Sequence, residues 1–326
     1  MLKNTGLHDL PQVITEHVIG DYLTEEDKSA LALTSKETQG FFQPKRMQMI
    51  VNKLLLQVMH GEQEKARKIL KRHPGLLEMT GEATDYSGRK FNTTAFRYAL
   101  WALDTRYMCN MMLDCLPDSP QGEAIKQALL MQLKAHEQDG VLYKLNGVTI
   151  HEAHYDFSPL IEALETYVNN FDDWYAANNF DAVRNQWYKV VGLAQLYVPA
   201  HVAQHYCDPD ESFGPTPQFN KKTFKRALEF YNYVTRKHEF WFTAVSSTSG
   251  LGVNFGIMRA TRAAGCVGGV EAFPLGRGAL STRVDLAAVT ALCKVRTLDL
   301  VLLMQRLEGL VKKLDADHGS PQCVIS

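Results

Sequence analysis

The last four residues of the sequence carry its strongest chemical signal. Cys323 is followed by the aliphatic residues Val324 and Ile325 and by a terminal Ser326. This C-a-a-X arrangement directs a prenyltransferase to the cysteine thiol, and a terminal serine favours a farnesyl group. The preceding segment DADHGSPQ is polar and contains glycine and proline, which predicts a flexible spacer. We therefore expect a farnesyl group on Cys323, added by a farnesyltransferase of a eukaryotic cell.

Two histidine pairs have spacings that could serve metal binding. His201 and His205 stand at positions i and i+4, so on a helix both rings share one face. His151, His154 and Asp156 in HEAHYDF offer further ligands. Neither pair is the HExxH motif, whose internal glutamate acts as a general base. Since histidine pairs also occur in helical cores, the sequence favours a structural or peptide-binding role, and no metal is expected.

A third chemical candidate is Glu271 in GGVEAF, which follows FWFTAVSSTSG. A strand ending in Ser-Thr-Ser is similar to one part of arginine-directed ADP-ribosyltransferases. That similarity implies that Glu271 would orient the nicotinamide ribose and stabilise developing positive charge. No Glu-x-Glu follows, so a buried aromatic strand leading into a Ser/Gly turn is favoured. The glycines of the sequence match neither the G-x-G-x-x-G motif of dinucleotide-binding proteins nor the GxxxxGK(S/T) motif of P-loop proteins.

The composition limits the possible classes of protein. The chain has 326 residues, which predicts two or three compact units. Its formal net charge of −1 gives no sign of a nucleic-acid partner. The six cysteines lack metal spacing and indicate reduced thiols. The N-terminus shows no cleavable signal, and no run of about 18 apolar residues predicts a membrane span.

The elements that must position these residues are mostly helices. A helix ending at Gly140 is followed by a β-hairpin, because Asn146-Gly147 suits a type I′ turn. Two or three helices then follow Ser158. Further helices are expected over residues 221–237, from Ser281 or Thr282 to Leu292, and over residues 297–313. An aromatic stripe at helical spacing predicts core positions, with a partly exposed fraction suited to protein binding: Phe171, Trp174, Tyr175, Phe180, Trp187 and Tyr188.

The N-terminal segment, residues 10–42, predicts two short helices. Pro11 suits a first helical turn, and Thr24 is an N-cap followed by three acidic residues. The segment resembles the F-box, the motif by which substrate receptors bind the Skp1 subunit of cullin ubiquitin ligases. The resemblance implies that Skp1 is contacted by Leu10, Pro11, Val18, Ile19 and Leu23. It departs from the family in lacking the acid after the proline and the late tryptophan, and the interval from Pro11 to Leu23 is one residue longer.

Residues 52–116 predict a second helical module. Two helices flank Gly61, a turn covers Asp85 to Gly88, and Thr94 opens another helix. This segment resembles ankyrin repeats, which pair an Asp-x-x-Gly turn with a Thr-Pro-Leu-His-x-Ala helix start. Because an array needs about three repeats to bury its core, the module is interpreted as degenerate and dependent on its neighbours.

The order of these segments resembles prenylated F-box and ankyrin-like effectors that intracellular bacteria such as Legionella inject into host cells. The expected fold is mainly α, with a minor β-hairpin in the C-terminal domain. The expected domains are 1–50 (F-box-like), 51–120 (ankyrin-like), 121–314 (mostly helical) and 315–326 (flexible tail).

The resemblance implies a protein secreted into the host cytoplasm and held on the cytoplasmic face of a host membrane by its lipid. There it would recruit Skp1 and the cullin ligase to a host target, without nucleic acid and without a cofactor other than farnesyl. The alternative is an effector enzyme whose C-terminal domain transfers ADP-ribose or hydrolyses a substrate with a metal, with the F-box as an accessory.

Overall fold

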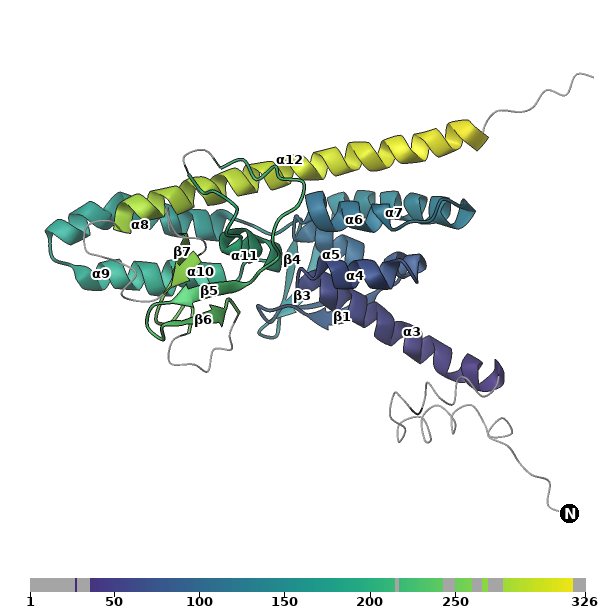
Figure 1. Cartoon of the computed structure of the whole chain (residues 1–326), viewed down its shortest axis with the longest axis horizontal. Helices are drawn as coiled ribbons and strands as arrows, with labels where there is room; N and C mark the ends of the chain where they lie inside the picture. Colours follow the sequence, from purple (N-terminus) through teal and green to yellow (C-terminus); the bar gives the residue numbers. More distant parts are fainter. Residues whose placement is uncertain are drawn as a thin grey trace, which may run out of the picture. The chain divides into compact units, whose positions relative to one another are not determined.

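The computed structural model describes Asp27 and residues 36–214, 217–242, 250–259, 266–268 and 278–318. Its side chains are described at position 27 and over residues 45–214, 217–242, 250–259, 266–268 and 280–309. The chain divides into two compact units, Met1–Leu54 and Leu55–Ser326, and helix α3 (Lys36–Met59) begins in the first and ends in the second. The described part is mainly helical with two small sheets, which confirms the predicted class (Figure 1).

The second unit begins with short helices around a hairpin. These elements are α4 (Gln63–Leu70), the 3-10 turn η3 (Pro74–Glu78), β1 (Gly81–Thr84), β2 (Lys90–Thr93), α5 (Ala95–Trp101), the π-helical turn η4 (Thr105–Cys109), α6 (Asn110–Asp114) and α7 (Pro120–Asp139). Thr94 opens α5 as predicted, because its hydroxyl accepts a hydrogen bond from the Arg97 N–H at 3.1 Å. Gly140 ends α7 as predicted and has φ +57°, a conformation that glycine adopts without strain.

The predicted turn from Asp85 to Gly88 connects β1 to β2. The Asp85 carboxylate accepts hydrogen bonds from the N–H groups of Ser87 and Arg89, both at 2.9 Å, and forms a buried ion pair with the Arg89 side chain at 2.7 Å. The Arg89 guanidinium also lies 4.9 Å from the centre of the Trp101 ring. These contacts tie the turn to the aromatic core beneath it.

The predicted hairpin is present as β3 (Val141–Leu145) and β4 (Val148–Glu152), with φ +51° at Asn146 and +81° at Gly147. It does not stand alone. Strands β1 to β4 form one antiparallel sheet in the order β1-β2-β3-β4, so this sheet takes strands from both sides of position 120.

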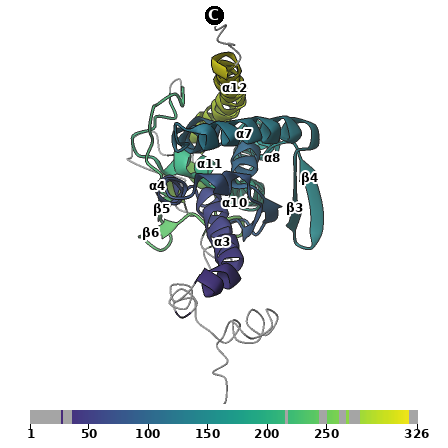
Figure 2. The ribbon, with the colours of Figure 1, turned by 90° about the vertical axis from the view of Figure 1, so that its right-hand side faces the viewer.

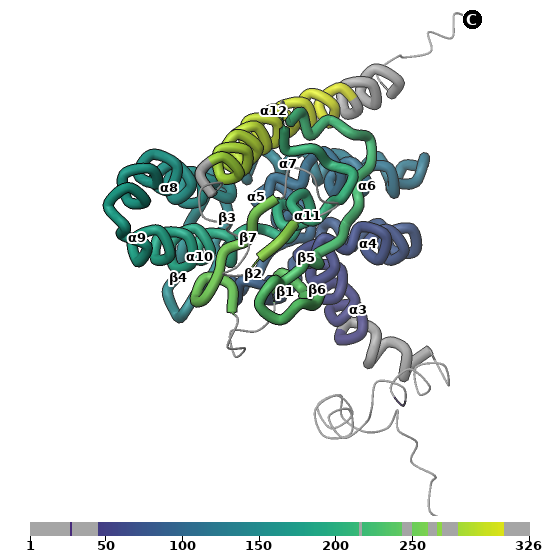
Figure 3. The backbone as a smooth tube through the Cα atoms, turned by 60° about the vertical axis from the view of Figure 1, so that its left-hand side comes forward, coloured from purple at the N-terminus to yellow at the C-terminus, as the bar shows by residue number. Residues whose placement is uncertain are grey.

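The remainder of the second unit combines helices with a second sheet. Its elements are α8 (Ser158–Ala176), α9 (Phe180–Asn185), the π-helical turn η5 (Gln186–Val191), α10 (Gly192–Leu196), α11 (Ala200–Cys207), β5 (Glu229–Asn232), β6 (Lys237–Phe240), β7 (Ile257–Arg259), β8 (Cys266–Gly268) and α12 (Gly278–His318). The sheet order is β6-β5-β8-β7, with β5 and β8 parallel. Helix α12 packs along α8, α7 and η4 (Figures 1 and 2), and β7 lies beside α11 (Figure 3).

The prediction of a helix over residues 221–237 is wrong. The segment up to Leu228 has no regular structure, and β5 and β6 follow it. In β5, Phe230 and Asn232 are buried while Glu229 is exposed, which is the alternation of a strand. Tertiary contacts decide the upstream part, because Phe224 and Arg226 enter the core, as described below.

The two helices predicted near the C-terminus form the single helix α12. The expected start of the second one, Thr297, lies inside that helix, and its hydroxyl donates a hydrogen bond to the Cys293 carbonyl at 3.0 Å. A threonine that satisfies its hydroxyl on the preceding turn need not interrupt a helix. Among the described residues, no helix is long and apolar enough to span a membrane.

The aromatic stripe is core only in part. Phe171 and Trp187 are buried, and their rings lie 5.5 Å and 5.1 Å from that of Tyr167, which is also buried. Tyr175 is 37% exposed, and Trp174 is intermediate. The prediction of a mixed core and surface stripe is therefore confirmed for these positions.

A buried histidine, arginine and carboxylate cluster

Helix α11 carries both histidines of the predicted pair. His201 and His205 are buried, and their ring centres lie 6.4 Å apart, as expected for one helix face. The residues around them come from α4, from Asp104 and η4, from Glu211 and the segment 217–228, and from α12, rather than from the other histidine motif. We call this group of charged and polar side chains the buried cluster: Gln63, Asp104, Arg106, His201, Gln204, His205, Glu211, Arg226, Arg296 and Asp299.

His205 is enclosed by an aromatic ring and a cation. Its ring stacks on Phe224 with centres 4.2 Å apart and an angle of 7° between the planes, and Nε2 lies 3.0 Å from the Arg296 guanidinium. Burial, and then the charge of Arg296, hold the pKa of His205 well below its ordinary value. The neutral ring therefore accepts a hydrogen bond from Arg296 through Nε2, so this nitrogen already has a partner and faces a positive charge.

Asp104 and Arg226 form the centre of the cluster. Two Arg226 nitrogens lie 2.9 Å and 3.1 Å from the Asp104 oxygens, a bidentate pair. Arg226 also donates to the side-chain oxygens of Gln63 at 2.9 Å and Gln204 at 3.0 Å. Burial opposes ionisation of Asp104, but the charge and the hydrogen bonds of Arg226 lower the pKa of its carboxyl to about 2. Asp104 therefore stays charged at neutral pH.

A second ion pair joins η4 to α12. Arg296 pairs with Asp299, and Arg106 reaches the same carboxylate at 3.0 Å. Arg106 also donates to the Asn220 carbonyl at 2.6 Å, and Tyr107 to the Lys221 carbonyl at 2.9 Å. The cluster thus fastens the irregular segment 217–228 between helices that are distant in sequence.

The space around His201 is too small for a substrate. The cavity next to its ring has a volume of about 10 Å³ and is lined by Tyr98, Asp104 and Pro199 among others. That volume is about the space of a single water molecule. With paired charges and so little space, the buried cluster is suited to holding the fold together rather than to converting a substrate.

The second histidine motif does not extend this cluster. His151 lies on β4, is exposed, and contacts the Asp139 carbonyl through Nε2. His154 contacts the Tyr155 carbonyl through Nδ1 at 3.0 Å, and Asp156 accepts a hydrogen bond from the Ser158 N–H at 2.8 Å. Within the described ranges, no three His, Cys, Asp or Glu side chains are grouped as metal ligands.

Other predicted site residues lie outside the described residues: Leu10, Pro11, Val18, Ile19, Leu23, Glu271 and Cys323. Sequence reasoning missed Asp104, Arg226 and Arg296. One signal was readable, because Arg296 and Asp299 stand at i and i+3 within an apolar stretch of α12, where charges on the core side require a partner.

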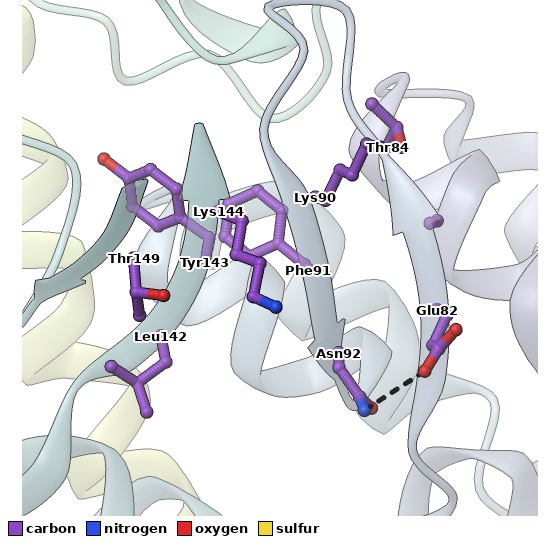
Figure 4. A pocket seen from close by; sticks show the side chains of 10 residues that line it. Glu82, Thr84, Lys90, Phe91, Asn92, Leu142, Tyr143, Lys144 and Thr149 are labelled. Carbon is purple, nitrogen blue, oxygen red and sulfur yellow. Dashed lines mark hydrogen bonds between the residues drawn. The ribbon is translucent and has the colours of Figure 1, made fainter. Parts of the chain in front are cut away.

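The second unit also has an open groove of about 700 Å³ on the first sheet. It lies over β1 to β4, and its exposed lining includes Thr84, Lys90, Leu142, Lys144 and Thr149 (Figure 4). Its size falls in the range of ligand-binding sites, and its open form suits a flexible segment of a partner. This groove, unlike the buried cluster, is accessible to a second molecule.

The fold and the site define a mainly helical protein with two small sheets. Side-chain ion pairs hold its core together, and an accessible groove lies on the first sheet. The family described as the CBUA0006 C-terminal domain matches residues 159–307, which include His201, His205, Arg226 and Arg296 but begin after Asp104. The chain is 40% identical over 271 residues to the uncharacterized protein CBUA0006 of Coxiella burnetii (strain RSA 493 / Nine Mile phase I), an alignment that spans 78% of this chain and 74% of the relative. The chain belongs to the CBUA0006 family. No solved structure matches it.

Proposed function

We propose that the chain is an effector that acts in a eukaryotic host cell as a membrane-anchored adaptor for a Skp1–cullin ubiquitin ligase. The observation that carries the proposal is the order of three segments: F-box-like residues 10–42, ankyrin-like residues 52–116, and the C-a-a-X residues 323–326. A relative in a bacterium supports it, because prenylation signals are read by eukaryotic enzymes. A prenylation signal on a chain of this family would be of use inside a eukaryotic host.

Each segment has a binding role in this proposal. The F-box-like residues Leu10, Pro11, Val18, Ile19 and Leu23 contact Skp1, and the helical body selects a host protein. The farnesylated tail holds the complex on the cytoplasmic face of a membrane. The adaptor makes no bond itself, since it acts by raising the effective concentration of target lysines at the ligase.

The combined change Leu10→Ala and Pro11→Ala should abolish Skp1 capture from host cells. Truncating an apolar anchor at an interface costs a few kcal/mol, and about 2.8 kcal/mol weakens binding roughly 100-fold. The measurement is affinity purification of wild type and variant, with quantification of Skp1 and cullin. Equal recovery by a variant with unchanged thermal melting contradicts the F-box assignment, as does recovery of unrelated partners alone by the wild type.

Cys323→Ser should move the protein from the membrane fraction to the soluble fraction of host cells. One lipid chain gives marginal and reversible binding, and Asp315 and Asp317 oppose the basic Lys312 and Lys313. We therefore expect partial membrane association in the wild type, lost in the variant and after inhibition of farnesyltransferase. Identical fractions in all samples, or no added mass on the C-terminal peptide, rule out the lipid.

A further inference from the structure

Four exposed side chains form one row across the face of the first sheet. The strand register pairs Thr84 with Lys90, Lys90 with Lys144, and Lys144 with Thr149. All four side chains are exposed and line the groove. The row therefore places two ammonium groups on the central strands β2 and β3, with a hydroxyl on each outer strand.

The groove results from how β2 and β3 pair. They pair at Lys90–Lys144 and Phe91–Tyr143, whereas β3 and β4 pair at every position from Val141 to Leu145. On the same face, further along the strands, lie Asn92 and Leu142, and Leu142 is 59% exposed. Figure 4 shows the Lys144 side chain over the space between these strands. The hollow thus combines a positive row with an apolar contact.

The opposite face of the same strands is rigid. Phe91 and Tyr143 are buried with ring centres 5.0 Å apart, and Phe91 lies 4.9 Å from Trp101. Because side chains alternate along a strand, these buried rings fix the positions of Lys90 and Lys144 on the exposed face. The row is therefore carried by packed backbone and not by a loop.

The two lysines form an unfavourable pair in the isolated chain. Like charges directly opposite on neighbouring strands destabilise a sheet. In the described part of the chain, neither lysine forms an ion pair, and Glu82, the acid that lines the groove, accepts a hydrogen bond from Asn92 at 3.3 Å. An anion placed between Lys90 and Lys144 would convert this repulsion into attraction.

We propose that this groove binds an extended acidic segment of a partner protein. The inference rests on the proposed function, for which it supplies the chemistry of the target. A carboxylate of the segment lies between Lys90 and Lys144, Thr84 and Thr149 donate hydrogen bonds beside it, and an apolar side chain contacts Leu142. Two lysines in a hollow suit one or two carboxylates, whereas a nucleic acid requires a long basic stripe.

The test uses a labelled peptide of alternating glutamate and valine, with the glutamine–valine peptide as its neutral counterpart. We expect the acidic peptide to bind the full chain with an affinity that falls as salt rises. Lys90→Glu with Lys144→Glu should weaken binding at least tenfold. The matched control is Lys189→Glu with Lys294→Glu, which makes the same charge change at exposed lysines outside the groove and should have no effect.

A single variant separates binding from folding. Lys144→Glu creates an attractive pair with Lys90, so it should raise the melting temperature while it weakens peptide binding. The inference is overturned if Lys90→Glu with Lys144→Glu leaves the peptide affinity unchanged. It is also overturned if the acidic peptide and its neutral counterpart bind equally well. Tighter binding of anionic vesicles or an oligonucleotide at the same lysines does so too. Skp1 capture, measured in parallel, reports on the proposed function, because the groove variants should retain it.

Discussion

Asp104→Ala is expected to lower the free energy of unfolding by about 3 kcal/mol, because it leaves Arg226, whose side chain is only 12% exposed, without its counter-charge. Asp104 is 4% exposed and is held by two Arg226 nitrogens at 2.9 Å and 3.1 Å. Arg226 would keep only Gln63 and Gln204 as partners. Equilibrium unfolding in urea at neutral pH measures the loss.

The control is Asp114→Ala, which removes an exposed ion pair with Arg306. Such surface pairs contribute about 0–1 kcal/mol. A second variant, Asp104→Ala with Arg226→Met, removes both charges of the pair and should recover much of the stability, since apolar replacement of a whole ion pair in the core is often tolerated. If Asp104→Ala costs no more than Asp114→Ala, the buried cluster does not fasten the fold as described.

The His201 and His205 pair shows what the sequence could and could not predict. Their spacing alone places both rings on one helix face, and the structure confirms it. Their partner Arg296 stands 91 positions away from His205, and no local pattern encodes that approach. It depends on how α12 packs against α11 and η4, which is a property of the whole unit.

Packing between distant segments also explains why the prediction of a helix over residues 221–237 was wrong. Its residues have helical propensity. However, Arg226 forms an ion pair with Asp104, and Phe224 stacks on His205, and these two contacts hold the segment in an irregular path. Propensity is a weak preference of tenths of a kcal/mol per residue, and a buried ion pair outweighs it. The row of exposed side chains on the first sheet could not be predicted from the sequence either, since Lys90 and Lys144 become neighbours only through the pairing of β2 with β3.

Acidification should destabilise the protein between pH 6.5 and 5, and two buried histidines should account for much of that loss. Burial, and then Arg97, lower the pKa of His136 to about 4, and burial lowers that of His201 to about 3 despite Asp104. Both rings stay neutral in the folded chain at pH 5, while the unfolded chain binds protons below about pH 6.5. As pH falls below about 6.5, the stability lost to each ring approaches about 1.4 kcal/mol per pH unit.

The double variant His136→Leu and His201→Leu should flatten this dependence. Between pH 6.5 and pH 5, the two substitutions together should reduce the loss by roughly 3 kcal/mol relative to wild type. Asp285 and Glu211, whose pKa values are raised by burial, gain protons on acidification and oppose the trend, but they are shared by both proteins. Urea unfolding at pH 6.5 and pH 5 measures the difference. The control Leu129→Ala destabilises the buried side of α7 without removing a titrating group, so its pH dependence should match wild type. Identical pH dependence in the double variant and wild type would show that these rings are not held neutral by the fold.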